Sequence, residues 1–239
     1  MPFSLSRFLQ RALLCSLPAL TAVAQAADSV ILLHGLARTE NSMDTMQEAL
    51  EAEGFCVANL GYDSRDGDIE TLAVEAIEPA LAICPDAETV HFVTHSLGGI
   101  LVRQYLSEHE IPGLGRVVML GPPNQGSEVV DKLREVPGFE FVNGEAGLEL
   151  GTGPASVPNS LGSADFDLGI IAGTQSVNLI LSQMIPGTDD GKVSVESTRL
   201  DGMNDHLEMD VTHTFMMTND EVIEQVIHYL RSGQFNRVE

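Results

Sequence analysis

The sequence predicts an α/β fold, in which a doubly wound and mostly parallel sheet of about six strands carries helices on both faces. Short, continuous apolar segments alternate along the chain with stretches whose apolar residues recur at helical spacing. These apolar segments lack the polar alternation of a half-exposed strand, as expected of parallel strands covered on both sides. Polar and glycine-rich turns follow several of them, at the end where such sheets gather their active groups.

The elements can be assigned in chain order from these patterns. The expected strands cover residues 29–33, 56–60, 90–93, 116–120, 168–172 and 207–211. The expected helices cover residues 43–50, 69–83, 97–106, 128–135 and 222–230. Asn41 or Ser42 is expected to cap the first helix, and Pro79 to kink the second. Residues 136–165 follow neither period and are rich in glycine and proline, so we expect a cap or a long ordered loop there.

The N-terminus has the pattern of a secretory signal peptide. Residues 1–26 combine two early arginines, an apolar run and an Ala24-Gln25-Ala26 cleavage site. The apolar run is too short to span a bilayer well, although a retained N-terminal anchor is the alternative. Residues 27–239 are therefore expected to form one exported domain, periplasmic or secreted, with no stable membrane anchor after cleavage.

The charge of the chain excludes several kinds of partner. It carries 12 Lys and Arg against 35 Asp and Glu, a formal net charge of −23. Such a surface is repelled by nucleic acid and by anionic membranes, so no nucleic-acid partner is expected. The oligomeric state is not predicted by the sequence.

Two cysteines, Cys56 and Cys84, remain after the predicted cleavage. An even number in an exported protein indicates a disulfide, with two separate buried thiols as the alternative. Because the C-x-x-C spacing is absent, neither a redox role nor a zinc site is expected.

The most informative stretch is the turn between the third strand and its helix, Thr94-His95-Ser96-Leu97-Gly98-Gly99. A strand, a tight turn with a serine and a helix together form a nucleophile elbow. The turn exposes the serine hydroxyl above the helix N-terminus, and the next backbone N–H can face a developing oxyanion. Gly98 and Gly99 leave room for the helix to pack on the strand. Thr94 stands where the G-x-S-x-G pattern has its first glycine.

A nucleophilic serine needs a general base, and the base needs an acid that fixes its tautomer. His213 follows the last expected strand, and Asp190 lies in a turn that also follows a strand. Asp189 is the alternative acid. His206 is the alternative base, although it lies at the start of the last strand, the wrong end of the sheet for this chemistry.

Five segments carry a resemblance to a known family: LLHGLART (32–39), VTHSLGG (93–99), LGPPNQGSE (120–128), TDDGKVSVEST (188–198) and VTHTFMM (211–217). With them the chain resembles a small bacterial lipase/esterase-like member of the α/β-hydrolase superfamily, in a minimal form. The resemblance implies Ser96 as nucleophile, His213 as general base and then acid, and Asp190 as the orienting acid. It also implies an oxyanion hole made by the backbone N–H groups of Leu36 and Leu97.

Other polar residues are assigned supporting roles. His95 is expected to shape the elbow, and His34 with Gly35 to form a hydrogen-bonded loop. Three acids, Asp201, Asp205 and Asp210, invite comparison with a calcium site. In so acidic a chain we expect them to be a solvated face, so no metal and no cofactor are predicted.

The expected activity is hydrolysis of a small-molecule or lipid carboxylic ester through an acyl-enzyme. The same three residues also serve acyltransferases, thioesterases, phospholipases and amidases, and the fold does not choose between these reactions. A catalytically inactive binding module on the same fold is the alternative from another functional class.

Overall fold

The computed structural model describes residues 27–237, so the signal peptide predicted for residues 1–26 lies outside the described residues. Six strands form one parallel sheet in the order β2-β1-β3-β4-β5-β6. The strands are β1 (Ser29–Leu33), β2 (Cys56–Asn59), β3 (Val90–His95), β4 (Leu114–Leu120), β5 (Leu168–Gly173) and β6 (Asp205–Met209). The predicted fold class is confirmed.

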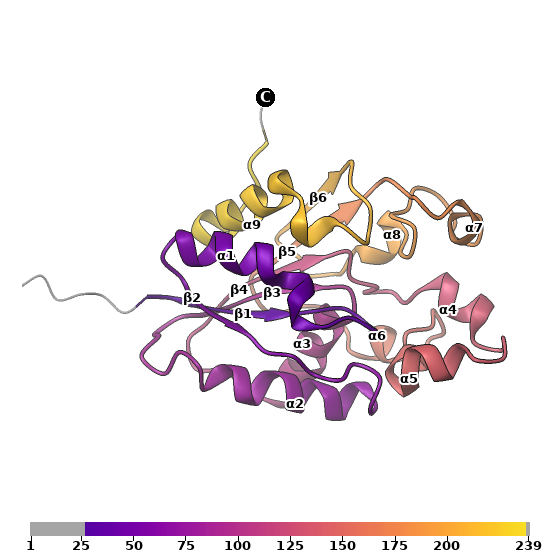
Figure 1. The fold of residues 1–239 in the computed structure, drawn as a ribbon, viewed down its shortest axis with the longest axis horizontal. Coiled ribbons are helices and arrows are strands. Elements are labelled where there is room, and N and C mark those ends of the chain that lie inside the picture. The colour runs from indigo at the N-terminus through magenta and orange to yellow at the C-terminus, as the bar shows by residue number, and fades with distance from the viewer. Residues whose placement is uncertain (1–26, 238–239) are drawn as a thin grey trace, which may run out of the picture.

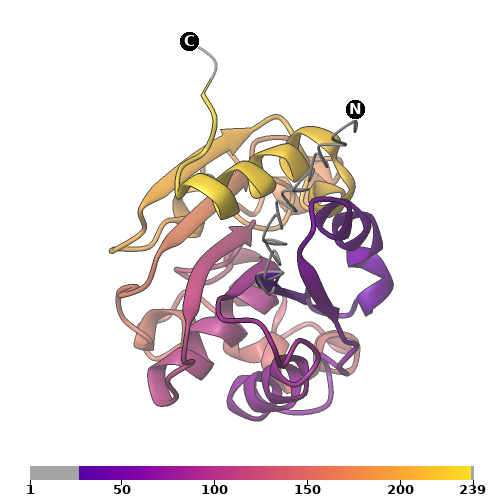
Figure 2. The same cartoon turned by 90° about the vertical axis from the view of Figure 1, so that its left-hand side faces the viewer.

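Helices cover both faces of this sheet (Figures 1 and 2). One face carries α1 (Asp44–Ala52) and α9 (Asp220–Ser232), and the other carries α2 (Ile69–Leu81) and α3 (Leu97–Glu108). The shorter helices are η1 (Glu40–Met43), α4 (Glu128–Leu133), α5 (Phe139–Glu149), α6 (Val157–Ser160), α7 (Leu179–Ser182), α8 (Val195–Thr198) and η2 (Met216–Thr218). None of the helices within residues 27–237 is long and apolar enough to cross a bilayer.

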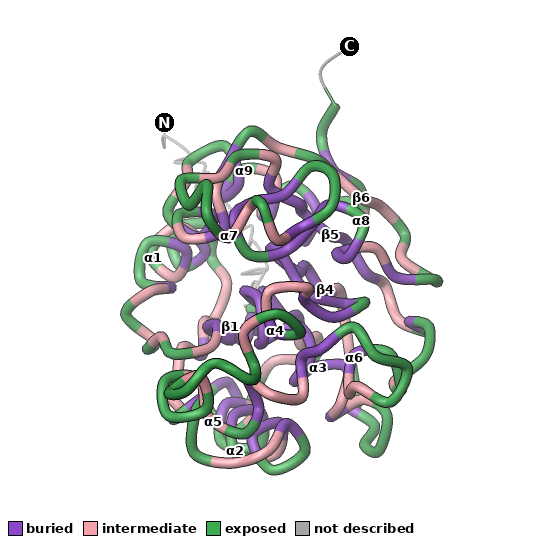
Figure 3. Tube along the Cα trace, turned by 90° about the vertical axis from the view of Figure 1, so that its right-hand side faces the viewer, coloured by how far each residue is buried: buried purple, intermediate pink, exposed green. Residues whose placement is uncertain are grey.

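The side chains on the two faces of each central strand pack into two separate hydrophobic cores. In β1, Ile31 and Leu33 pack into the core under α2 and α3, whereas Val30 and Leu32 pack into the core under α1 and α9. All four side chains are buried. Figure 3 shows this buried centre of the sheet surrounded by exposed helices and loops. Because both faces are covered, the strand reads as a continuous apolar run.

Some element boundaries differ from the prediction. Asn41 and Ser42 do not cap α1: they belong to η1, and the Ser42 hydroxyl donates to the Thr39 carbonyl at 2.7 Å. The last strand covers Asp205–Met209 and not 207–211, because pairing with β5 begins at Asp205. After Met209 the chain turns, and the Val211 N–H donates back to the Met209 carbonyl. The apolar–polar alternation continues through this turn, which explains the error.

A disulfide joins Cys56 at the start of β2 to Cys84, which follows α2. This confirms the predicted bond. It fastens the edge strand β2 to the helix that covers its face, across a sequence separation of 28 residues.

Reduction of this disulfide should lower the free energy of unfolding by roughly 3–4 kcal/mol, the chain-entropy value for a loop of this length. Urea denaturation with and without dithiothreitol measures the difference. The Cys56→Ser/Cys84→Ser variant is the control, since the reductant should leave its midpoint unchanged. Equal stability of the oxidised and reduced protein would contradict the prediction.

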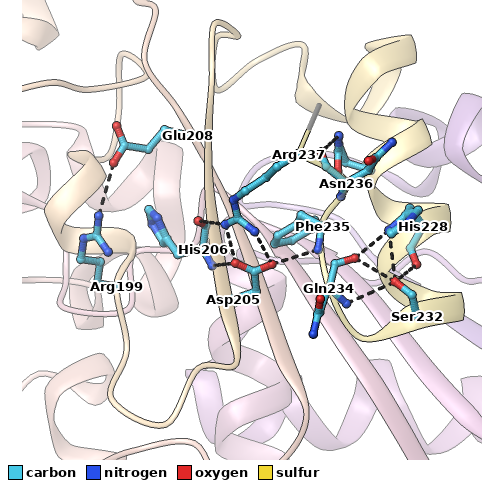
Figure 4. A network of polar contacts seen from close by, with 11 residues as sticks. Arg199, Asp205, His206, Glu208, His228, Ser232, Gln234, Phe235, Asn236 and Arg237 are labelled. Atoms are coloured by element: carbon cyan, nitrogen blue, oxygen red, sulfur yellow. Dashed lines mark hydrogen bonds and ion pairs between the residues drawn. The ribbon is translucent and has the colours of Figure 1, made fainter. Parts of the chain in front are cut away.

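Asp205 at the start of the edge strand β6 binds the C-terminal residues Phe235 and Arg237 through hydrogen bonds (Figure 4). Both carboxylate oxygens of Asp205 accept hydrogen bonds from the Arg237 guanidinium, and one also accepts the Phe235 N–H at 2.9 Å. Phe235 is buried beside Tyr229. The hydrogen bond from Arg237 is the main cause that holds the pKa of Asp205 below its ordinary value. Asp205 is therefore a structural acid here.

Arg237→Ala should destabilise the protein by about 1 kcal/mol at pH 7, because a half-exposed arginine contributes only part of a charged hydrogen bond. A depressed folded-state pKa means that Asp205 stabilises the fold above its unfolded pKa of about 4 and that this stabilisation is lost as pH falls through the folded value. The effect of Arg237→Ala should therefore shrink below pH 4 in urea titrations. Arg134→Ala is the control, because this exposed arginine has no ion pair among residues 27–237, and its effect should not change with pH in this way. A pH-independent loss would contradict this account.

Candidate active site

Ser96 occupies a strained turn between the end of β3 and the start of α3. Its backbone has φ 54° and ψ −118°, in a region that residues with a side chain rarely adopt. Such a conformation costs on the order of 1–3 kcal/mol and persists only where the surroundings enforce it. Here β3 pairs on both sides, with β1 and β4, and α3 begins immediately at Leu97.

Two glycines allow α3 to lie directly on the sheet. A Cβ at Gly98 would stand 2.6 Å from the carbonyl oxygen of Leu33 in β1, and one at Gly99 would stand 3.1 Å from the sulfur of Met119. Any side chain at Gly98 would push the helix away from β1. Thr94, where a glycine is usual, is accommodated in β3 as a fully buried residue. The elbow geometry predicted from the sequence is present.

The structure brings Asp190 and His213 together. His213 Nδ1 lies 2.7 Å from Asp190 Oδ2, and both side chains are buried. The other carboxylate oxygen of Asp190 accepts the backbone N–H groups of Lys192 at 3.0 Å and Val193 at 2.9 Å. A carboxylate held by two N–H donors only accepts, so the proton of the pair resides on Nδ1. The lone pair of His213 Nε2 is then available to receive a proton.

A glycine that the sequence analysis did not single out makes this pair possible. Gly121 follows β4 with φ 53°, and a Cβ there would stand 2.9 Å from Asp190 Oδ2 and 3.1 Å from His213 Nδ1. Only a residue without a side chain lets the end of β4 pass so close to the Asp190–His213 pair. The sequence offered two signals for it: Gly121 follows an apolar strand directly, and it lies within the segment 120–128 that carries the resemblance.

The alternative acid and base lie elsewhere. Asp189 accepts the Gly191 N–H at 2.7 Å and the Ser182 hydroxyl, so its carboxylate faces α7. His206 is in β6, where its Nε2 lies 2.9 Å from the Thr198 hydroxyl, and it is the neighbour of Asp205, which binds Arg237 (Figure 4). Burial lowers the pKa of His206 to about 4.

His95 links the elbow to the segment that carries His213. His95 Nε2 lies 2.9 Å from the His213 carbonyl oxygen, which only accepts, so this nitrogen donates. Burial is the main cause that lowers the pKa of His95 well below its ordinary value, and the positive charge of Arg38 adds to this. His95 is therefore a neutral structural link. A Cβ at Gly35 would stand 2.7 Å from its ring, so glycine lets the loop after β1 reach the elbow.

The loop after β1 is fixed by its own hydrogen bonds. His34 stacks on Tyr62 with ring centroids 4.0 Å apart, and the Tyr62 hydroxyl donates to the His34 carbonyl. Burial lowers the pKa of His34, as expected for a neutral loop residue. Ala37 has φ 54° and donates its N–H to the Ser64 hydroxyl at 2.9 Å. These contacts hold the backbone on either side of Leu36.

Leu36 and Leu97 carry the two backbone N–H groups that are expected to form the oxyanion hole. Leu36 lines the same cleft as Ser96, and Leu97 follows Ser96 in the chain. Within residues 27–237, neither backbone N–H donates a hydrogen bond to another group of the chain. Both donors are thus available to a bound group.

Ser96 and His213 share one cleft of about 270 Å³. Its walls are largely apolar and come from α4, α5, α7, the turn after β4 and the loops that hold Leu36, Leu150 and Val193. These apolar lining residues are Leu36, Pro123, Val129, Val130, Leu133, Phe139, Leu150, Leu181 and Val193. Residues 136–165, where the sequence predicts a cap or long loop, contain α5 and α6, and α5 supplies part of this wall. Two cations that the sequence analysis did not identify, Arg38 and Lys192, line the same cleft.

Two helices that line the cleft, α5 and α7, also carry exposed apolar side chains. Phe141 of α5 is 90% exposed and Ile180 of α7 is 73% exposed. Both helices lie at the end of the molecule where the strands of the sheet end, on the right in Figure 1 and facing the viewer in Figure 3. Four more exposed apolar residues lie in these two helices or shortly before them: Val136, Val142, Val177 and Leu179. The segments that supply two walls of the cleft therefore also expose apolar surface, in a protein that is acidic as a whole.

No known family profile and no curated protein sequence matches this chain, but solved structures share its fold. The mature form of the lipase BlEst2 from Bacillus licheniformis superposes with a TM-score of 0.63 and 17% identity, over 86% of this chain and 92% of that one. A metagenome-derived lipolytic enzyme of the LipS and LipT study gives a TM-score of 0.62 at 14% identity, over 87% and 94%. The phospholipase PlaB from Legionella pneumophila gives 0.57 at 20% identity, over 72% of this chain and 46% of that one. The chain thus has the α/β-hydrolase fold that lipases and esterases share.

His95→Leu should destabilise the protein by about 1–3 kcal/mol, because it leaves the buried carbonyl of His213 without a donor. Equilibrium urea unfolding measures the loss. His95→Gln is the matched control, since its side-chain amide can replace the Nε2 donor and should recover most of the stability. If both variants are as stable as the wild type, His95 does not link the two segments.

Proposed function

We propose that this protein is a serine hydrolase that cleaves carboxylic esters, with Ser96 as nucleophile, His213 as general base and acid, and Asp190 as the orienting acid. One observation carries the proposal: the buried Asp190–His213 pair leaves the Nε2 lone pair free in the same cleft as a serine on a strained turn. A purely structural hydrogen-bonded pair would require neither a strained serine nor a cleft shared with it.

In the proposed mechanism, the Ser96 oxygen attacks the ester carbonyl while His213 Nε2 takes the hydroxyl proton. The N–H groups of Leu36 and Leu97 donate to the oxyanion, and Asp190 stabilises the imidazolium. Collapse of the tetrahedral intermediate breaks the bond to the alcohol, which leaves with the proton from His213. A water molecule, deprotonated by His213, then attacks the acyl-enzyme and releases the acid and free Ser96.

The apolar walls suit the acyl part of the ester, and the exposed apolar side chains of α5 and α7 suit a substrate that is a lipid or lies at a lipid–water interface. The fold neighbours BlEst2, LipS/LipT and PlaB, described as lipolytic enzymes and a phospholipase, support the same reaction class. Interfacial activation would favour a lipase, and its absence would favour an esterase that acts on soluble esters.

We also place the proposed enzyme outside the cytoplasm, in the periplasm or the medium. The disulfide between Cys56 and Cys84 supports this location, because such bonds persist in oxidising compartments. The signal-peptide pattern of residues 1–26 supports it independently.

Hydrolysis of p-nitrophenyl esters of increasing acyl length tests the assignment of the acid. Asp190→Asn should lower kcat by roughly four orders of magnitude, because the amide favours the wrong tautomer of His213. Asp189→Asn is the matched control and should retain most of the activity. Ser96→Ala and His213→Gln should be inactive, while His206→Gln should keep its rate.

Equal losses for Asp190→Asn and Asp189→Asn would remove Asp190 from the mechanism. Full esterase activity of a clean Ser96→Ala preparation would overturn the whole proposal. The acyl length with the highest kcat/KM indicates how much of the apolar cleft the substrate fills.

A further inference from the structure

The charge of the cleft is opposite to the charge of the protein. The chain has almost three acids for every base, with 35 Asp and Glu against 12 Lys and Arg. In the described part of the chain, however, no Asp or Glu lines the cleft, whereas Arg38 and Lys192 both do. Two cations without a lining acid, beside apolar walls, make this cleft attractive to an anion that also carries an apolar part.

Neither cation is used by the protein for an ion pair. Within residues 27–237, the salt bridges of arginine involve Arg residues 65, 116, 199, 231 and 237. The Arg38 guanidinium donates one hydrogen bond, to the Thr214 carbonyl at 3.3 Å, and has further N–H donors. Lys192 binds Asp190 through its backbone N–H, which leaves the side-chain ammonium out of that contact.

Both cations lie close to the Asp190–His213 pair. Arg38 is anchored to the residue that follows His213, and Lys192 is two residues after Asp190. Partial desolvation lowers the pKa of Lys192 and the positive charge of Arg38 adds to this lowering, while the charge of Asp190 opposes it. Both cations line the same cleft, so an anion bound there would be attracted by both.

We propose that the ester substrate carries an anionic group on its alcohol part, and that Arg38 and Lys192 bind this group beside His213. The inference rests on the proposed function, in which His213 donates a proton to the leaving alcohol and therefore faces that half of the ester. The acyl half occupies the apolar walls of α4, α5 and α7. A phosphate suits two cations best, because it accepts a bidentate guanidinium and also an ammonium.

In this arrangement the anionic substrate is recognised only by the two cations in the cleft and is not attracted by the surface of the protein as a whole. The acidic surface repels anionic membranes as a whole, whereas the cleft attracts a single anionic molecule. Selection would then come from the cleft itself. The substrate class is an acyl ester of a phosphorylated alcohol, either soluble or as the headgroup of a lipid with one phosphate.

Two matched substrates test the inference: the butyryl ester of glycerol and the butyryl ester of glycerol 3-phosphate, both monomeric in water. The wild type should show a kcat/KM at least about tenfold higher for the phosphate ester, since one charged hydrogen bond corresponds to about one order of magnitude. Arg38→Gln and Lys192→Gln should each reduce this ratio, and the double variant should bring it close to one. The ratio should also fall with rising salt.

Charge-conserving and distant variants serve as controls. Arg38→Lys and Lys192→Arg should keep much of the ratio. Arg134→Gln removes an exposed cation at the end of α4 that does not line the cleft, and should leave the ratio unchanged. Oleoyl esters of the same two alcohols in neutral detergent micelles then separate a lipid headgroup, favoured in micelles, from a soluble phosphate ester, favoured as the butyryl compound.

A wild type that cleaves the neutral ester as fast as the phosphate ester would overturn the inference and leave the proposed function intact. The same holds if Arg38→Gln and Lys192→Gln slow both esters equally, because the cations would then stabilise the reaction without selecting an anion. If the wild type cleaves neither ester nor any p-nitrophenyl ester, the proposed function itself fails, and the inference fails with it.

Discussion

The close approach of α3 to β1 is the constraint on which the candidate site depends. Gly98 lies against the carbonyl oxygen of Leu33, so the helix begins at Leu97 without a connecting loop, and Ser96 is forced to positive φ. The serine hydroxyl, the Leu97 N–H and the His95 ring are thereby fixed in one rigid unit. The hydrogen bond from His95 Nε2 to the carbonyl oxygen of His213 then fixes the segment that carries His213 relative to the elbow. A shift of α3 by the width of a methyl group would move all of these groups together.

The sequence predicted those parts of the site that depend on local chemistry. The elbow is a continuous segment, and the strand, turn and helix that surround Ser96 are each encoded within a few residues. The choice of Asp190 over Asp189 came from a resemblance, and the structure pairs Asp190 with His213. Arg38 and Gly121 were missed because their roles exist only between distant segments. Arg38 contacts Thr214 across 176 positions of the chain, a relation that no local period reveals.

The segment over the cleft shows why periodicity failed there. Phe139 in α5 and Leu150, which follows the helix, line the cleft, while Phe141 and Val142 are exposed, so apolar residues occupy both sides of this segment. Gly144 interrupts the helix with φ 70°. Because apolar residues lie on both sides of α5 and Gly144 interrupts it, the sequence shows no amphipathic stripe there, although the residues are helical. Apolar residues on one side of this segment line the cleft, and those on the other side are exposed to solvent.

Active-site labelling tests the central claim, that the fold activates Ser96 as a nucleophile. The wild-type protein should react with a fluorophosphonate at one site per chain, and peptide mapping should place the label on Ser96. Folded Ser96→Ala should take up none, and His213→Gln should react far more slowly, because the base is lost. Labelling at another serine, or no labelling of a folded wild type, would contradict the account.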